Sequence, residues 1–225
     1  MFIAAMDPPW HCESGGGGRG ANSKYRLATV AAICRAILES GAWPDDTSDA
    51  LVWMWATSRA LMLGHAFDLT DRLGIEPVSS FVWNKVHPQC ARCGGLLDSP
   101  SSKKYDGMPA CACLSPTYGA PRPGIGQWQR TEHEHLLLCR RGNVQIPPFP
   151  SRQRSTIYAP RHPIHSRKPE KAWRVIEETS KHLATTGVEF FAREPRRSPT
   201  FSWGAWGHID GEDKPPRFLP PGGDP

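Results

Sequence analysis

The stretch Met1-Phe2-Ile3-Ala4-Ala5-Met6-Asp7-Pro8-Pro9-Trp10 guides the interpretation of the whole chain. Its first six residues form an apolar run with the length of one buried strand, so Asp7 stands where that strand ends. The two prolines fix φ and bring no backbone N–H donor. The result is a corner rich in acceptors beside the flat ring of Trp10. Such a corner suits a planar ring with an exocyclic amino group, which would donate to Asp7 and Pro8 and stack on Trp10. The alternative is a plain Pro-Pro turn with an incidental acid.

The composition indicates one α/β domain with much loop. The chain has 225 residues, of which 39% are hydrophobic, with 21 Gly and 23 Pro. No run approaches the roughly 20 apolar residues of a membrane span, and the N-terminus lacks a signal peptide, so we expect a cytoplasmic protein with no membrane partner. A net charge of +5 is compatible with nucleic acid. Seven cysteines in such a chain favour metal binding or buried thiols over disulfides.

The first 83 residues alternate between strand and helix patterns. After the initial strand, apolar residues at helical spacing predict a helix over 27–39, and the run 51–56 predicts a buried strand. Ser58 is expected to cap a helix that ends at Gly74, and 78–83 predicts another strand. This alternation indicates a doubly wound, mostly parallel sheet.

The rest of the chain is less regular. A strand is expected over 134–139, a loop rich in Pro, Arg and His over 143–167, a helix over 169–184 and a strand over 188–192. We expect a main domain over 1–213 and a disordered tail rich in Pro and Gly over 214–225.

Residues 86–124 are predicted to be an insertion in the main domain that is stabilised by metal. They carry no periodicity and contain four cysteines in two pairs, namely Cys90, Cys93, Cys111 and Cys113. Two such pairs across a loop of this size are typical of a zinc-ribbon-like site with four thiolates. The alternative is four free thiols in a flexible loop, but a loop of about 40 residues without structure of its own is uncommon.

Basic residues are frequent in the loops that should follow the predicted strands. Doubly wound sheets bind ligands at the carboxyl ends of their strands, and arginines there would contact phosphates. The arginines in these loops are Arg152, Arg154, Arg161, Arg167, Arg196 and Arg197. We assign Arg161, Arg196 and Arg197 to the substrate.

Several stretches, taken in order, resemble the MT-A-type adenine-N6 methyltransferases. This family includes the catalytic subunit of the eukaryotic mRNA methylase and many bacterial and phage DNA enzymes. The matching stretches are Asp7-Pro-Pro-Trp10, Leu51-Val-Trp-Met-Trp-Ala-Thr57, Phe81-Val-Trp-Asn-Lys85, Gly126-Gln-Trp-Gln-Arg130 with Glu134-His135, Lys168-Pro169, and Glu189-Phe-Phe-Ala-Arg193 with Trp203 and Gly207. The resemblance spans nearly the whole chain and implies a Rossmann-like fold in permuted order, with the catalytic strand first and S-adenosylmethionine as cofactor.

The resemblance also implies roles for single residues. Asp7 resembles the catalytic acid, which also contacts the cofactor, while Pro8 and Pro9 resemble its carbonyl partners and Trp10 the stacking residue. The residues that resemble cofactor contacts are Lys168 and Arg193. His208 and Ile209 stand where the family often has Asn and Gln on the cofactor, and are departures from that pattern.

Tyr25 resembles the tyrosine that closes the first loop over the site, and Trp128 and Arg130 belong to a matching stretch assigned to the substrate. Many relatives carry an extra segment before the catalytic strand that helps to hold the cofactor adenine, whereas this sequence starts at that strand. The Cys-rich stretch is also larger than the corresponding loop expected in the family.

The predicted function is methylation of adenine N6 in DNA, by a prokaryotic or phage member of the family. DNA is favoured over RNA because the small construction resembles those members. Alternative predicted functions are adenine methylation of RNA, cytosine-N4 methylation of DNA, and the role of a non-catalytic partner subunit that binds nucleic acid. Non-catalytic subunits typically lack the Asp of the Asp-Pro-Pro-Trp tetrapeptide, so the presence of Asp7 argues against this last function. The oligomeric state, monomer or homodimer, is left open.

Overall fold

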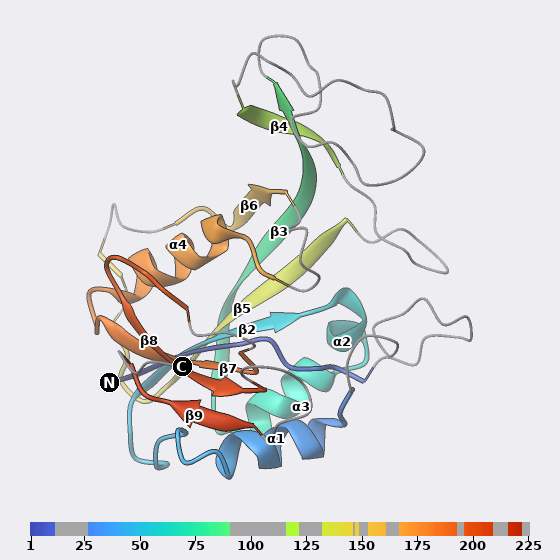
Figure 1. The fold of residues 1–225 in the computed structure, drawn as a ribbon. Helices are drawn as coiled ribbons and strands as arrows, with labels where there is room; N and C mark the ends of the chain where they lie inside the picture. Colours follow the sequence, from blue (N-terminus) through green and yellow to red (C-terminus); the bar gives the residue numbers. More distant parts are fainter. Residues whose placement is uncertain are drawn as a thin grey trace. The chain divides into compact units, whose positions relative to one another are not determined.

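The computed structural model has a mixed α/β fold (Figure 1), and the chain divides into two units. It describes residues 1–11, 27–90, 116–121, 132–145, 147–148, 153–160, 167–192, 196–208 and 216–221, without the side chains of 87–90 and 116–121. Unit 1 comprises Met1–Phe81, His135–Gln153 and Val175–Pro225, and unit 2 comprises Val82–Glu134 and Arg154–Arg174. Three elements contribute residues to both units, namely β3 (Glu76–Cys90), β5 (His133–Arg141) and α4 (Glu170–Ser180).

The sheet of unit 1 combines a parallel centre with antiparallel strands on both sides. Its strands are β1 (Phe2–Met6), β2 (Ala50–Ala56), β7 (Thr186–Phe190), β8 (Ser202–Gly207) and β9 (Arg217–Leu219), together with the part of β5 in this unit. Their order is β5-β2-β1-β7-β8-β9. The pairs β1–β2, β1–β7 and β7–β8 are parallel, whereas β2–β5 and β8–β9 are antiparallel. An apolar run has the same pattern in either direction, so the sequence of β5 could not show that it runs against β2.

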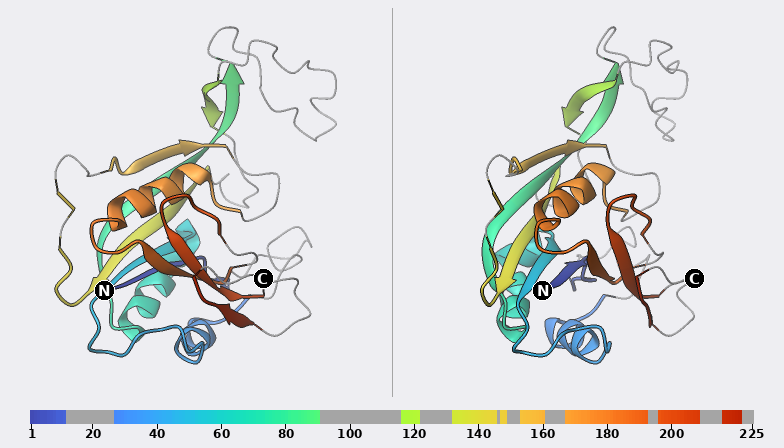
Figure 2. Two further views of the ribbon diagram at one scale, coloured as in Figure 1. Left: turned by 60° about the vertical axis from the view of Figure 1, so that its left-hand side comes forward. Right: turned by 90° about the vertical axis from the view of Figure 1, so that its left-hand side faces the viewer.

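The core of unit 1 lies on both faces of its central strands. Alternate residues, such as Met6 and Met54, pack on one face against α1 (Val30–Leu38) and α3 (His65–Arg72). On the other face, Trp53 Nε1 donates to Ser180 Oγ of α4 at 3.1 Å. Figures 1 and 2 show α1 and α3 on one side of these strands and this end of α4 on the other. Helices on both faces are the arrangement expected for a doubly wound sheet.

The helix expected from Ser58 to Gly74 is two helices. Thr57, rather than Ser58, caps α2 (Ser58–Met62) by accepting from Ala60 N at 3.1 Å. Gly64 then adopts a left-handed φ of 74° and separates α2 from α3. Met62, the last residue of α2, is 84% exposed. A glycine inside a helical pattern was the signal for the break.

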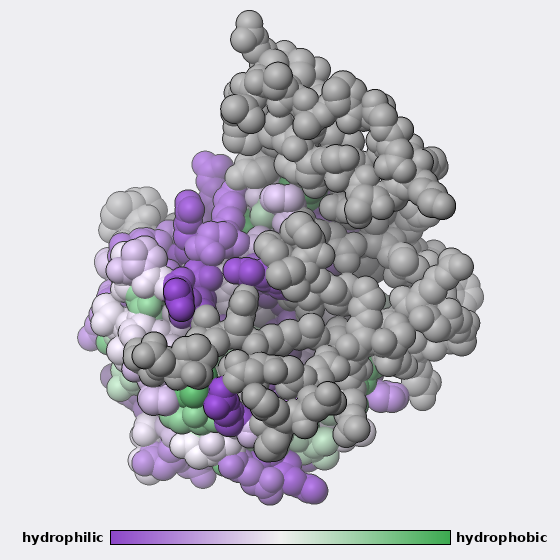
Figure 3. Space-filling model, viewed as in Figure 1, coloured by the Kyte–Doolittle hydropathy of each residue, from purple (hydrophilic) through white to green (hydrophobic). Residues whose placement is uncertain are grey.

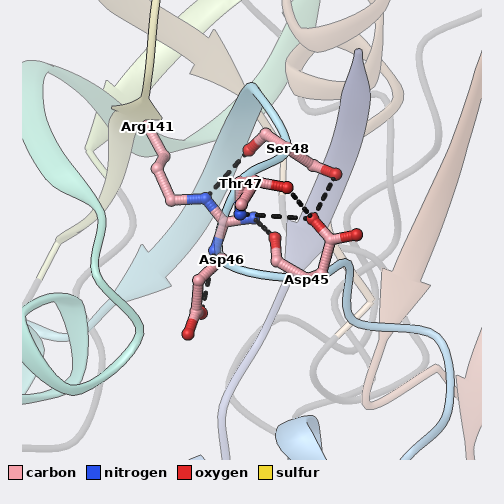
Figure 4. A network of polar contacts seen from close by, with 5 residues as sticks. All are labelled: Asp45, Asp46, Thr47, Ser48 and Arg141. Carbon is pink, nitrogen blue, oxygen red and sulfur yellow. Dashed lines mark hydrogen bonds and ion pairs between the residues drawn. The ribbon is translucent and has the colours of Figure 1, made fainter.

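A polar network ties the end of β5 to the loop before β2 (Figure 4). Arg141 donates through Nε to Ser48 O at 2.9 Å and through Nη2 to Asp45 O at 2.6 Å. The Asp45 carboxylate in turn accepts from the hydroxyls of Thr47 and Ser48, each at 2.8 Å. Arg141 therefore closes the edge of the sheet at which β1 and β2 begin.

Two buried thiols lie in the unit 1 core. Cys34 of α1 and Cys139 of β5 are free, as the sequence predicted for buried cysteines. Burial raises the pKa of the Cys34 thiol and raises that of Cys139 to about 12. Both are therefore protonated at neutral pH.

Unit 2 contains strands in segments that were expected to be loop. β4 (Pro116–Pro121) pairs antiparallel with the far end of β3, and β6 (Thr156–Ala159) pairs parallel with β3 over Val82–Lys85. The prolines of β3 and β4 argue against strands in a sequence pattern, and a four-residue strand such as β6 is too short to show a period.

The expected disordered tail holds one further strand, because β9 pairs with β8 through Trp206↔Phe218. No helix among the described residues is long and apolar enough to cross a membrane. On the face shown in Figure 3, the described side chains at the surface are mainly hydrophilic, with hydrophobic residues in small separate places.

Candidate active site

The carboxyl ends of four parallel strands meet at one edge of the unit 1 sheet. β1 ends before Asp7, β2 before Thr57, β7 before Phe191 and β8 before His208. The chain passes from β1 through α1 to β2 on one side, whereas β7, on the other side of β1, is reached from α4. The β1–β7 boundary is therefore a topological switch point, where open α/β sheets bind ligands.

The stretch Asp7–Trp10 leaves β1 at this switch point. Asp7 is half-buried and Pro8 is buried. Trp10 N donates to Pro8 O at 2.8 Å, and Ala28 N donates to Pro9 O at 2.9 Å. Each proline carbonyl therefore already accepts one hydrogen bond, and each keeps a second lone pair. The turn therefore retains acceptor capacity at both carbonyls. The chemistry predicted for this corner stays a prediction.

Trp10 lies in the core rather than presenting an open ring face. It is 6% exposed, and its Nε1 donates to Trp55 O of β2 at 2.9 Å. Its neighbours include residues of α1 and β2. In this conformation Trp10 holds the turn against β2, so its stacking on a substrate ring remains a prediction.

Opposite Asp7, the end of β7 has an unusual backbone. Met6 of β1 pairs with Phe190 of β7. The next residues along these two neighbouring strands, Asp7 and Phe191, therefore lie side by side in the register. Phe191 has a φ of 64°, a conformation that costs energy for a residue with a side chain and is most frequent at functional sites. Its ring is nearly perpendicular to that of Trp206, with 5.5 Å between the two centroids.

Gly207 allows β7 and β8 to approach closely beside Phe191. Ala192 N donates to Trp206 O at 3.0 Å, and a Cβ on Gly207 would lie 2.2 Å from Ala192 O. Any side chain at Gly207 would therefore push the two strand ends apart. His208 follows this contact and is exposed at the same edge, where the resemblance expects a cofactor residue.

Lys168 occurs in unit 2, in a cluster with two other charged residues. Its Nζ lies 2.9 Å from Glu134 Oε2, and Lys85 Nζ lies 2.6 Å from Glu134 Oε1. Both lysine side chains are nearly buried, with 10% and 9% exposed. Glu134 therefore holds two ammonium groups through its two oxygens, and the cluster has a net positive charge.

Burial alone would raise the pKa of Glu134, but Lys168 and Lys85 outweigh this effect and lower it to about 2. The carboxylate is consequently ionised at any ordinary pH. Lys85 also lies over the ring of Trp83, 5.2 Å from its centroid. Sequence reasoning assigned no role to Lys85 or Glu134, although both occur in stretches that carry the resemblance.

Arg196 has a protein partner in place of the expected phosphate. Its Nε donates to Glu177 Oε1 of α4 at 3.2 Å, and its side chain is 11% exposed. Glu177, itself buried, also accepts from Ser198 Oγ at 2.9 Å and Trp203 Nε1 at 3.0 Å. The phosphate interpretation of Arg196 is thus not supported by its surroundings, whereas Arg197 is exposed. A Glu within the apolar pattern of α4 was the missed signal for this anchor.

The remaining predicted residues lie outside the described part of the chain. They are Tyr25, Trp128, Arg130, Arg161, Arg193, Ile209, Cys93, Cys111 and Cys113. Cys90 ends β3, but its side chain is not described. Among the residues that the structure describes, no group of three or more His, Cys, Asp or Glu could hold a metal ion.

Comparison with known families gives a match over part of the chain. The MT-A70 family model matches residues 116–207, which include Glu134, Lys168 and Glu177 but not Asp7–Trp10. No curated protein matches the chain. The MT-A70 family implies, in general, methyl transfer from S-adenosylmethionine to adenine N6. The match over residues 116–207 supports an MT-A70-type methyltransferase as the family of this chain.

Proposed function

We propose that this chain transfers a methyl group from S-adenosylmethionine to the exocyclic amino group of adenine in DNA. The observation that carries the proposal is the position of Asp7-Pro8-Pro9 at the carboxyl end of β1, on the switch point of the sheet. The family match supports adenine-N6 methylation in general and does not distinguish DNA from RNA. DNA is proposed from the resemblance to bacterial and phage members, as is the permuted order of the fold.

The chemistry proposed for Asp7 follows from the nature of the substrate group. An exocyclic amine is a poor nucleophile because its lone pair is delocalised into the ring. A hydrogen bond from the amine to the Asp7 carboxylate, and a second to the free lone pair of Pro8 O, would favour its pyramidal form. The carboxylate also stabilises the positive charge that develops on nitrogen. A base within duplex DNA would first have to be flipped out of the stack.

The switch-point edge fits the proposed cofactor. S-adenosylmethionine supplies an electrophilic methyl group on a positively charged sulfur. At this edge, the half-buried Asp7 carboxylate offers negative charge, which suits a cation. From the resemblance, Lys168, Arg193, His208 and Ile209 are proposed as further cofactor contacts.

The proposal is tested with purified protein, isotope-labelled cofactor and oligonucleotides with or without adenine. We expect label in adenine-containing DNA, and N6-methyladenine after nuclease digestion and mass spectrometry. Matched RNA oligonucleotides and DNA with cytosine as its only aminated base serve as comparisons. Methylation of RNA alone, or of cytosine, would contradict the proposal and select one of the alternative substrates.

We further propose that Cys90, Cys93, Cys111 and Cys113 hold one structural zinc ion. Cys90 and Pro116 are paired at the ends of β3 and β4, and the other three cysteines belong to the segment that joins these strands. Elemental analysis should find about one zinc per chain, and a Cys90→Ser, Cys93→Ser double variant should lose it. Cys12→Ser is the matched control and should retain zinc. Metal-free wild-type protein prepared without chelator would contradict this assignment.

A further inference from the structure

Positive charge is concentrated in unit 2. The segments of this unit contain twelve Lys or Arg and five Asp or Glu, whereas those of unit 1 contain fifteen Lys or Arg and seventeen Asp or Glu. The positive net charge of the chain therefore comes from unit 2. An excess of this kind in one unit is the electrostatic signature of a surface that binds a polyanion.

Strand β6 of unit 2 has one buried and one exposed side. Ile157 and Ala159 are 1% and 4% exposed, while Thr156 is exposed and Tyr158 is 44% exposed. Alternation along a strand places Thr156 and Tyr158 on the same face of the sheet. Arg154, two residues before β6, is also exposed. A large aromatic ring thus lies on an exposed sheet face with a cation close in the chain.

The neighbouring strands continue this face with polar groups. Tyr158 pairs with Asn84 of β3, which is half-buried. Lys85 N donates to Glu132 O at 2.7 Å, and the Glu134 side chain reaches Lys85 on the buried side. His133, between these two residues of the chain, therefore faces the same way as Asn84 and Tyr158. The exposed face carries aromatic and hydrogen-bonding side chains together.

The buried side makes this face rigid. Trp83 pairs with Ile157, and its Nε1 donates to Ala159 O at 2.9 Å. The Lys85–Glu134–Lys168 cluster lies on the same buried side of β3. A rigid sheet that presents aromatic rings beside cations is the usual design of surfaces that bind single-stranded nucleic acid, because bases stack on the rings and phosphates meet the cations.

We infer that the face formed by Arg154, Thr156, Tyr158, Asn84 and His133 binds single-stranded DNA, with a base stacked on Tyr158 and a phosphate at Arg154. The inference rests on the proposed function, for which it supplies a contact with the strand that carries the target adenine. Charge complementarity selects a polyanion as the occupant of this face rather than a neutral or acidic protein.

The test is fluorescence anisotropy of a labelled single-stranded DNA oligonucleotide with the full chain at several salt concentrations. Tyr158→Ala should weaken binding by about tenfold or more, since loss of one stacked base is expected, whereas Tyr158→Phe should stay within about twofold of wild type. Arg154→Ala should lower affinity and make the slope of log K against log salt shallower by about 0.7. Both side chains are exposed, so the fold should tolerate these changes.

Two exposed residues of unit 1 are matched controls. Phe67 of α3 is 47% exposed, close to the value for Tyr158, and Arg35 of α1 is exposed. Phe67→Ala and Arg35→Ala should leave DNA affinity unchanged. Equal effects of Tyr158→Ala and Phe67→Ala would overturn the inference, as would wild-type protein that binds no DNA or binds RNA more tightly.

The outcome separates this inference from the proposed function. Calorimetric titration with S-adenosylmethionine should give the same affinity for wild type and the Tyr158 variants, because the ring is assigned to DNA alone. If DNA binding depends on Tyr158 but no adenine is methylated, the surface is correct and the proposed reaction is not. If adenine is methylated with the same DNA affinity in Tyr158→Ala, the reaction is correct and the surface is not.

Discussion

Asp7→Ala should abolish methyl transfer while the protein stays folded. The carboxylate is the only charge in the Asp7–Trp10 turn, and it is placed to meet an amine that becomes cationic as it reacts. Loss of such a group costs about 3 kcal/mol of transition-state stabilisation or more, which is a rate reduction of at least about a hundredfold. The measurement is a single-turnover rate with labelled cofactor and an adenine-containing oligonucleotide.

Two comparisons make the result specific. Asp7→Asn keeps the size of the side chain and removes its charge, so it should lose nearly as much activity as Asp7→Ala. Asp46→Asn alters a fully exposed carboxylate in the loop before β2 and should leave the rate unchanged. Thermal unfolding of all three variants should stay close to wild type, since Asp7 lies outside the apolar core. A rate within tenfold of wild type for Asp7→Ala would remove this residue from the mechanism.

Glu134→Gln should destabilise the protein by about 3 kcal/mol at neutral pH. The substitution keeps the shape of the side chain but leaves the two nearly buried ammonium groups of Lys85 and Lys168 without the carboxylate that they share. Denaturant unfolding measures the loss. Glu178→Gln is the matched control, because Glu178 pairs with Lys181 at an exposed position of α4 and should change stability by about 0.5 kcal/mol or less. Equal losses of stability in Glu134→Gln and Glu178→Gln would contradict the argument that burial makes the Glu134 ion pairs important.

The same carboxylate predicts how stability depends on pH. Its pKa is lowered from an ordinary value of 4.5 to about 2 in the folded protein, so the unfolded chain takes up a proton more readily. The stabilisation from Glu134 is therefore complete above pH 4.5 and is lost as the pH falls towards about 2. The difference in unfolding free energy between wild type and Glu134→Gln should shrink across this interval. A difference that stays constant would show that the charge of Glu134 contributes nothing.

The sequence predicted the elements near the switch point because their patterns are local. The apolar runs of β1 and β2 and the amphipathic faces of α1 and α4 depend on residues within a few positions of one another. Strand direction and short strands depend on distant partners, which is why the sequence indicated the strand β5 but not its direction, and why β6 was expected to be loop. The signal for the helix break at Gly64 was also local, but the apolar pattern continues on both sides of this glycine and hid the break.

The residues of the candidate site also separate into those that local sequence identifies and those whose roles depend on distant partners. Asp7 and the prolines were identified because an acid followed by Pro-Pro after a strand has a chemical meaning by itself. Glu134 and Glu177 act through partners 34 to 49 and 19 to 26 positions away, respectively, so their roles appear only in the folded chain. For Arg196 the sequence suggested a phosphate contact, because a basic residue in a loop looks available for a ligand. The structure instead pairs it with the carboxylate of Glu177.

The two protonated thiols of the core give a direct readout of folding that is independent of enzyme activity. Cys34 and Cys139 are buried and have raised pKa values, so both should react only slowly with an alkylating reagent at neutral pH while unit 1 is intact. Both become reactive when the unit opens. Alkylation of these two positions, followed by mass spectrometry, therefore distinguishes an inactive variant that is folded from one that has lost its structure.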